Sequence, residues 1–194
     1  MVNLRSRRDH QKISEYPHLV LILALSLLLI PILGSLSSTP SPAQLIGEQA
    51  EMDRLEQQAD DLAAQGDPEG AALAIGKAAM MADILTKDSH ESSAKEIFKA
   101  ASFVYRAQEL GLRALALFER AGGHPPAPAG VCHYLVQGSK KLRSSKELLL
   151  KIPVMKQTEM KDRGEHFLEK NKEWKTLLQI LHEDFECSDP FKKK

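Results

Sequence analysis

The sequence predicts an all-α protein in which one transmembrane helix precedes antiparallel helical hairpins and a C-terminal capping helix. An uncharged apolar run covers 19–36. Beyond it, apolar and small residues recur every three or four positions in segments rich in Ala, Glu and Gln, which favour helices. Gly and Pro separate these segments, as they do where helices end and begin. The expected organisation is a basic cytoplasmic tail (1–18), a transmembrane signal-anchor (19–36), a linker (37–42) and a helical domain (43–194).

The apolar run from Leu19 to Leu36 is just long enough to cross a bilayer, which requires about 20 apolar residues, with a range of about 17 to 25. A buried core helix would carry polar residues along one face, and this run does not. A cleaved signal peptide remains an alternative to an anchor, because small residues follow the run. Pro40 and Pro42 lie in the expected cleavage region and weigh against it.

Basic residues predict the orientation of the anchor. Arg5, Arg7, Arg8 and Lys12 precede the run, and the next basic residue is Arg54. The positive-inside rule then places the N-terminus in the cytoplasm and the domain on the periplasmic, extracellular or lumenal side. A mitochondrial outer-membrane anchor with a cytosolic domain does not follow this rule and stays open.

Charge is balanced overall but uneven along the chain. The 194 residues contain 26 Lys and Arg and 26 Asp and Glu, for a formal net charge of zero. Acidic residues predominate in 43–100 and basic residues after it. Two solvated faces of opposite charge explain this pattern, as does a surface that sorts partners by charge.

The first helices are bounded by specific residues. Gly66 ends the first helix, Asp67 caps the second, and Pro68 stands in the first turn, where its missing N–H costs nothing. The second helix should reach Leu85 or Thr86. Ser93 and Glu96 have the spacing of a capping box at the start of the third.

Glycine and proline are expected to bound the later helices. Gly111 should separate the third helix from a fourth over 112–120, which ends at the glycines and prolines of 122–128. Two shorter helical pieces are expected over 131–136 and 144–150. A last helix begins at Thr158 and carries one apolar stripe against a back rich in Lys and Glu, so it is expected to cover the open end of the hairpins. The stripe consists of Met160, Phe167, Asn171, Trp174, Leu178, Leu181 and Phe185.

A shift of 43 residues aligns large residues with large ones and small with small. The aligned pairs are Leu55 and Phe98, Ala59 and Ser102, Leu62 and Tyr105, Ala71 and Ala114, Ile75 and Phe118, and Ala78 and Ala121. This order resembles the tetratricopeptide repeat, a helical hairpin of 34 residues. The resemblance covers 52–85 and 95–128, and Pro126 matches the proline that often ends a unit. Two departures are the extra residues 86–94 and the absence of a Gly-Asp turn from the second unit. A plain helical bundle is the alternative.

The resemblance implies a groove that binds a peptide or a helix of a partner protein. In tetratricopeptide domains this groove lies along the inner face of the first helix of each unit. The matching positions are Asp53, Glu56, Asp60, Lys99, Phe103 and Arg106. They would form a bipolar site with one aromatic ring. The alternative is that they are exposed helix residues that confer solubility.

The motifs of common catalytic sites are missing, so we expect no enzymatic activity, no cofactor and no small-molecule substrate. The sequence contains no phosphate-binding glycine loop, no Gly-x-Ser-x-Gly and no His-Glu-x-x-His. Cys132, His133, His182 and Cys187 lack the close pairing of metal ligands, so no metal site is expected. The aromatic content of 5% argues against nucleic-acid binding.

Cys132 and Cys187 are a candidate disulfide if the domain lies in an oxidising compartment. Two unpaired buried thiols are the alternative.

These features favour a membrane-anchored, non-enzymatic adaptor or scaffold that binds a partner protein through the groove. An accessory structural subunit of a larger membrane complex, with the stripe around Trp174 as its interface, is a second hypothesis. A hydrolase assembled from scattered His and Glu residues is a third.

Overall fold

The computed structural model describes residues 42–152 and 158–187, and within them all regular secondary structure is α-helical. The all-α prediction is therefore confirmed for this part of the chain. The helices are α2 (Pro42–Ala64), α3 (Pro68–Asp88), α4 (Ser92–Arg120), α5 (Ala129–Leu149) and α6 (Thr158–Asp184). The predicted membrane anchor, 19–36, lies outside the described residues. Among the helices that are described, none has the length and hydropathy of a membrane span.

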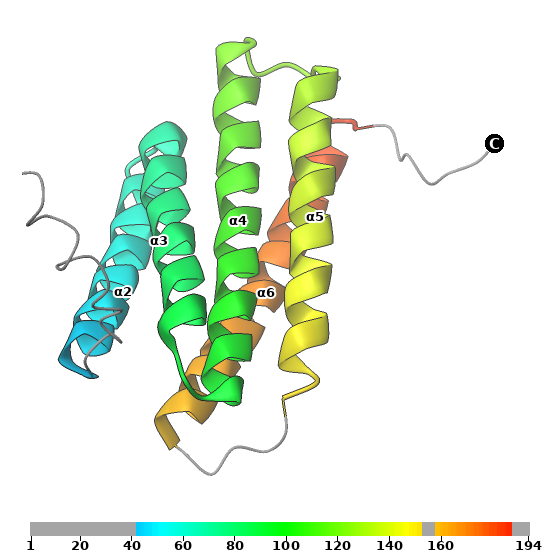
Figure 1. Cartoon of the computed structure of the whole chain (residues 1–194). Helices are drawn as coiled ribbons and strands as arrows, with labels where there is room; N and C mark the ends of the chain where they lie inside the picture. Colours follow the sequence, from blue (N-terminus) through cyan, green and yellow to red (C-terminus); the bar gives the residue numbers. More distant parts are fainter. Residues whose placement is uncertain (1–41, 153–157, 188–194) are drawn as a thin grey trace, which may run out of the picture. The chain divides into compact units, whose positions relative to one another are not determined.

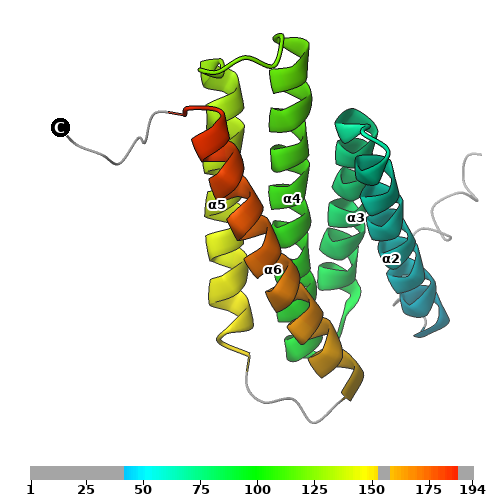
Figure 2. The same ribbon diagram turned by 180° about the vertical axis from the view of Figure 1, so that it is seen from behind.

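The first four described helices form one layer, and α6 crosses it. Helices α2, α3, α4 and α5 follow one another side by side (Figure 1). Helix α6 runs diagonally over α4 and α5, and its first turns approach the α2 and α3 side of the layer (Figure 2). We call the face of the layer that α6 covers the inner face, and the opposite face the outer face.

The turn between α2 and α3 forms as the sequence predicts. Gly66 has a φ of 77°, which glycine adopts without strain. The N–H of Asp67 then donates to the carbonyl of Leu62 at 3.0 Å. The Asp67 carboxylate accepts from the N–H of Gly70 at 2.8 Å, and Pro68 stands at the start of α3. These contacts satisfy backbone groups that both helix ends would otherwise leave unpaired.

The predicted helix break at Gly111 is wrong, because α4 continues through it to Arg120. Gly111 is instead a point of close contact between helices. A Cβ there would lie 2.8 Å from Leu178 Cδ2 and 2.9 Å from Trp174 Cζ3, both on α6. The missing side chain thus admits α6, and the second predicted hairpin, 93–110 with 112–120, is one straight helix.

Two further boundary predictions are corrected. Ser93 and Glu96 form no capping box, because α4 begins at Ser92 with Glu91 as its N-cap residue and the Ser93 hydroxyl bonds to the Glu91 carboxylate. The two short pieces predicted over 131–150 are the single helix α5. Its Gly138 also faces Leu178, since a Cβ there would lie 2.9 Å from Leu178 Cδ1.

The apolar stripe of α6 joins two core clusters, but α6 covers the inner face of the layer and not the open end of the hairpins, where it was predicted (Figure 2). Phe167 packs into a cluster with Met52, Ile75, Phe98 and Tyr105 from α2, α3 and α4. Leu178 and Phe185 pack into a second cluster with Phe118, Val131 and Leu135 from α4 and α5. Trp174 contacts both clusters. The stripe is thus part of the interior of this domain, and little of it is left to form an interface with another subunit.

Candidate partner-binding surfaces

The acidic side of α2 faces a basic side of α6. Asp53 and Arg163 form a bidentate ion pair, in which Nη1 lies 3.0 Å from Oδ1 and Nη2 lies 2.9 Å from Oδ2. This geometry fixes the relative rotation of both side chains, because the planar guanidinium matches the planar carboxylate. We call this contact and the next two pairs along the helices the α2–α6 ion-pair strip.

Glu56 is the centre of the α2–α6 ion-pair strip. Its side chain is 10% exposed, and its carboxylate accepts from the Tyr105 hydroxyl at 2.8 Å. His166 Nε2 lies 3.2 Å from the same carboxylate. Lys170 lies 3.3 Å from it and also 3.0 Å from the Asp60 carboxylate. A buried carboxylate requires such partners, since burying a charge without them is costly.

Contacts within the strip shift the pKa of Glu56, His166 and the neighbouring Tyr105. Burial alone raises the pKa of Glu56, but the hydrogen bond and charge of His166, with Tyr105 and Lys170, outweigh it and lower that pKa below 4.5. The hydrogen bond to Glu56 and its charge raise the pKa of His166 above 6.5, against a smaller opposing effect of burial. Burial and the nearby Glu56 charge raise the pKa of Tyr105 well above 10.0, so Tyr105 stays a hydrogen-bond donor.

These shifts predict a stability that depends on pH. The contribution of His166 is present below its ordinary pKa of 6.5 and is lost as pH rises through the higher folded value. The contribution of Glu56 is present above 4.5 and is lost as pH falls through its lower folded value. Between about pH 6 and 8 the free energy of unfolding should therefore fall as pH rises. Because His166 is half exposed, solvent screening limits this change to about 0.2–1 kcal/mol.

Urea denaturation of wild type and His166→Gln at several pH values measures this dependence. The difference in the free energy of unfolding between the two proteins should be largest near pH 6 and shrink toward pH 8. A Glu56→Gln background should remove most of the dependence, since it removes the carboxylate that is the main cause of the raised pKa of His166. A constant difference across this range would mean that His166 acts only through packing.

The structure separates the six residues predicted for the groove into two groups. Asp53, Glu56 and Asp60 lie against α6, which fills the space where a bound peptide was expected. A helix turns by about 100° per residue, so Phe103 points to the opposite side of α4 from Tyr105, which contacts this strip. The bipolar site therefore does not form as one groove.

The other three predicted residues belong to the outer face. Arg106 lies 3.6 Å from Asp83 of α3 and 3.0 Å from Glu109. The Phe103 ring lies 5.3 Å from the Lys141 ammonium of α5, a cation–π contact. Lys99 is exposed. All three face away from α6.

Apolar side chains are exposed on the outer face. Leu73 and Met80, two turns apart on α3, are 58% and 57% exposed, and Ile84 continues the same side of the helix. A shallow hollow of about 100 Å³ connects Leu73 with Leu117 of α4 and Tyr134 of α5. The Arg120–Glu69 ion pair, at 3.7 Å, lies at its edge. The helical spacing of Leu73, Met80 and Ile84 could have been recognised in the sequence. The identity of the helices that lie beside them could not.

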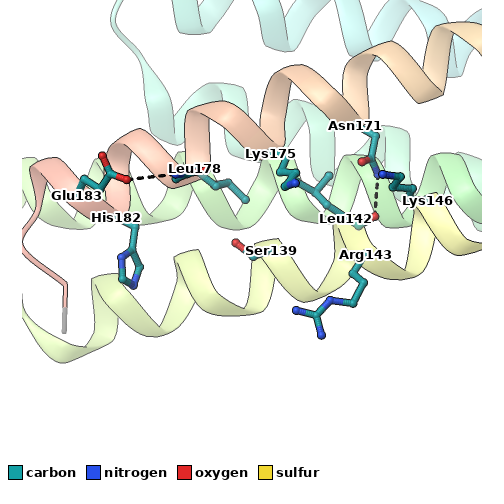
Figure 3. Close-up of a pocket in the computed structure, with 10 residues that line it drawn as sticks. Ser139, Leu142, Arg143, Lys146, Asn171, Lys175, Leu178, His182 and Glu183 are labelled. Carbon is teal, nitrogen blue, oxygen red and sulfur yellow. Dashed lines mark hydrogen bonds between the residues drawn. The ribbon is translucent and has the colours of Figure 1, made fainter. Parts of the chain in front are cut away.

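A larger cavity of about 490 Å³ opens between α5 and α6 (Figure 3). None of its lining residues was predicted as a site residue. Its lining residues are Ser139, Leu142, Arg143, Lys146, Asn171, Lys175, Leu178, Gln179, His182 and Glu183. The sequence shows that these residues recur every three or four positions along each of two helices. It does not show that the two helices pack against each other, so the cavity could not be predicted.

A disulfide joins Cys132 to Cys187, with the two Cα atoms 5.5 Å apart. This is the pairing that the sequence left open. It links the start of α5 to the chain just beyond α6, where Phe185 stacks on Phe118 with ring centroids 3.8 Å apart. The N–H of Ala127 donates to the carbonyl of Phe185 at 2.8 Å. The end of α6 is therefore fixed by covalent, aromatic and backbone contacts.

No group of three or more His, Cys, Asp or Glu side chains within 42–152 and 158–187 is placed to hold a metal ion. Comparison with protein-family models, curated proteins and solved structures finds no match for this chain. Its function is therefore inferred from its own sequence and geometry.

Proposed function

We propose that this protein is a non-enzymatic adaptor, held at a membrane by its N-terminal apolar segment, that binds a partner protein through the outer face of α3, α4 and α5. The observation that carries the proposal is the set of exposed apolar side chains on that face. Leu73 and Met80 are more than half exposed although they belong to a well-packed helix. Several apolar residues exposed on one face of a folded domain commonly mark an interaction site.

The spacing of the apolar residues on the outer face suits the binding of an amphipathic helix from the partner. Phe103, Leu110 and Leu117 follow at seven-residue intervals along α4, parallel to the apolar side of α3. A partner helix could place apolar residues between these two rows, as helix-in-groove complexes do. Lys99 and Lys141 lie beside Phe103 and favour acidic residues on the partner. The class of function is the one predicted from the sequence, but the proposed surface is the outer face, because the second repeat unit is one continuous helix and not a hairpin.

The disulfide is in keeping with the expected orientation of the anchor. Disulfides persist in oxidising compartments and are rare in the cytosol. The basic residues before 19–36 predict a domain outside the cytoplasm, and a Cys132–Cys187 bond would be stable there. Carbonate extraction and protease protection of native membranes test the anchor and the orientation separately from partner binding.

Partner capture tests the outer face. Full-length protein with a photoreactive residue at Leu110 should crosslink a discrete partner in native membranes. Leu73→Glu with Met80→Glu should weaken capture of that partner at least about tenfold, because each substitution removes an apolar contact and introduces a charge. Both side chains are exposed, so folding should be preserved.

Ile46→Glu is the matched control, because Ile46 is 67% exposed on α2 and is not part of the outer face. This variant should capture the partner as wild type does. Equal capture by the Leu73→Glu, Met80→Glu variant would rule out the outer face. A partner that copurifies in fixed stoichiometry and is needed for solubility would indicate the alternative function, an accessory subunit of a larger complex.

A further inference from the structure

The cavity between α5 and α6 has an apolar floor and a polar group at each end. Leu142 and Leu178, which are 2% and 1% exposed, form the floor. At one end the Asn171 side-chain amide donates to the Leu142 carbonyl at 2.8 Å, and His182 lies at the other end (Figure 3). Ligand sites commonly combine such an apolar surface with a few polar groups, and about 490 Å³ is within their usual size.

The rim of this cavity is basic. Arg143 and Lys146 line it from α5, and Lys175 and His182 line it from α6. The one acidic residue in the lining is Glu183, which accepts a hydrogen bond from Gln179 at 3.2 Å. The residues that line the mouth of the cavity are therefore predominantly basic.

Arg143 differs from the other described arginines. Arg54, Arg106, Arg113, Arg120 and Arg163 each form an ion pair with a carboxylate. Within the described residues Arg143 forms none, and Lys146 and Lys175 likewise have no acidic partner. Three exposed cations around one cavity, none of them paired with a carboxylate of the described residues, favour a negatively charged ligand.

We propose that the α5–α6 cavity binds a phosphate-bearing ligand. Guanidinium and ammonium groups bind phosphate oxygens through charge-assisted hydrogen bonds, and the Gln179 amide, which uses one N–H to bind Glu183, has a second N–H that can donate. The cavity is larger than one phosphate, so the leucine floor accommodates the body of the ligand. A free organic phosphate and the headgroup of an anionic lipid share this chemistry. The proposal does not depend on the outer face.

Calorimetric titration of the full-length protein in a nonionic detergent tests the proposal. The probes are pyrophosphate, glycerol phosphate and short-chain phosphatidic acid, with short-chain phosphatidylcholine as the uncharged comparison. Pyrophosphate should bind saturably. Arg143→Gln with Lys175→Gln should weaken its binding at least about tenfold, because two charge-assisted contacts are lost.

Lys140→Gln with Lys172→Gln is the matched control, because it removes the same charge from the same helices outside the cavity lining. It should leave pyrophosphate binding unchanged. Tighter binding of phosphatidic acid than of glycerol phosphate would assign the site to a lipid headgroup, and equal binding to a free organic phosphate. Absence of saturable binding of every phosphate probe, or equal weakening in both variants, would overturn the proposal.

Discussion

Replacing Cys132 and Cys187 together with serine is expected to lower the free energy of unfolding by about 4 kcal/mol. The bond closes a loop with a sequence separation of 55 residues. Cross-linking such a loop restricts the unfolded chain and stabilises the folded state by about this amount in the chain-entropy description. Urea denaturation of the full-length protein in detergent measures the effect.

Reduction is the control for the cysteine variant. Dithiothreitol should destabilise wild type to a similar extent and leave the double serine variant unchanged. If reductant changes neither protein and the variant loses less than about 1 kcal/mol, then the covalent link contributes nothing and the cysteines act as small apolar residues.

Truncating Phe167 to alanine is expected to cost about 3–5 kcal/mol, as for other buried aromatic residues. Phe167 is 1% exposed, and its ring meets that of Tyr105 edge to face with centroids 5.5 Å apart. The substitution would leave a cavity where α6 joins α2, α3 and α4. Denaturant unfolding followed by circular dichroism measures the loss.

Leu168→Ala is the matched control, because Leu168 is the next residue of α6 and is 39% exposed. It should change the free energy of unfolding by less than about 1 kcal/mol. Similar losses for the two variants would show that the Phe167 side of α6 is not packed against the layer, and the position of α6 would then be wrong.

Local signals allowed the first hairpin to be predicted from the sequence. The turn between α2 and α3 is set by Gly66, Asp67 and Pro68. These residues end one helix and start the next through local backbone geometry and capping, which do not require the rest of the fold. The α6 stripe was predictable for a similar reason, since its apolar residues repeat at helical spacing over many turns.

Gly111 shows why other boundaries were not predictable. A glycine within a helical pattern marks either an end or a close approach of another element, and the local sequence is the same in both cases. Here the deciding contacts are Leu178 and Trp174, more than sixty residues away along the chain. Only the tertiary arrangement distinguishes the two.

The candidate site was predicted in part for the same reason. The repeat resemblance placed Asp53, Glu56 and Asp60 together on α2, and the structure has all three facing α6, which the resemblance did not indicate. A signal was present, because Arg163, His166 and Lys170 have the same spacing with opposite charge. The α5–α6 cavity gave no comparable signal, since its cations become neighbours only after the helices pack.

The placement of α6 has a consequence for biosynthesis. Ribosomes make this helix after the other described helices, yet Tyr105 and Leu112 belong to the core cluster that Phe167 completes. A nascent chain that has not reached Thr158 therefore exposes the apolar residues of the inner face to chaperones and proteases. Premature termination upstream of that residue should yield a product that the cell degrades, although every partner of α6 in the layer has already been synthesised.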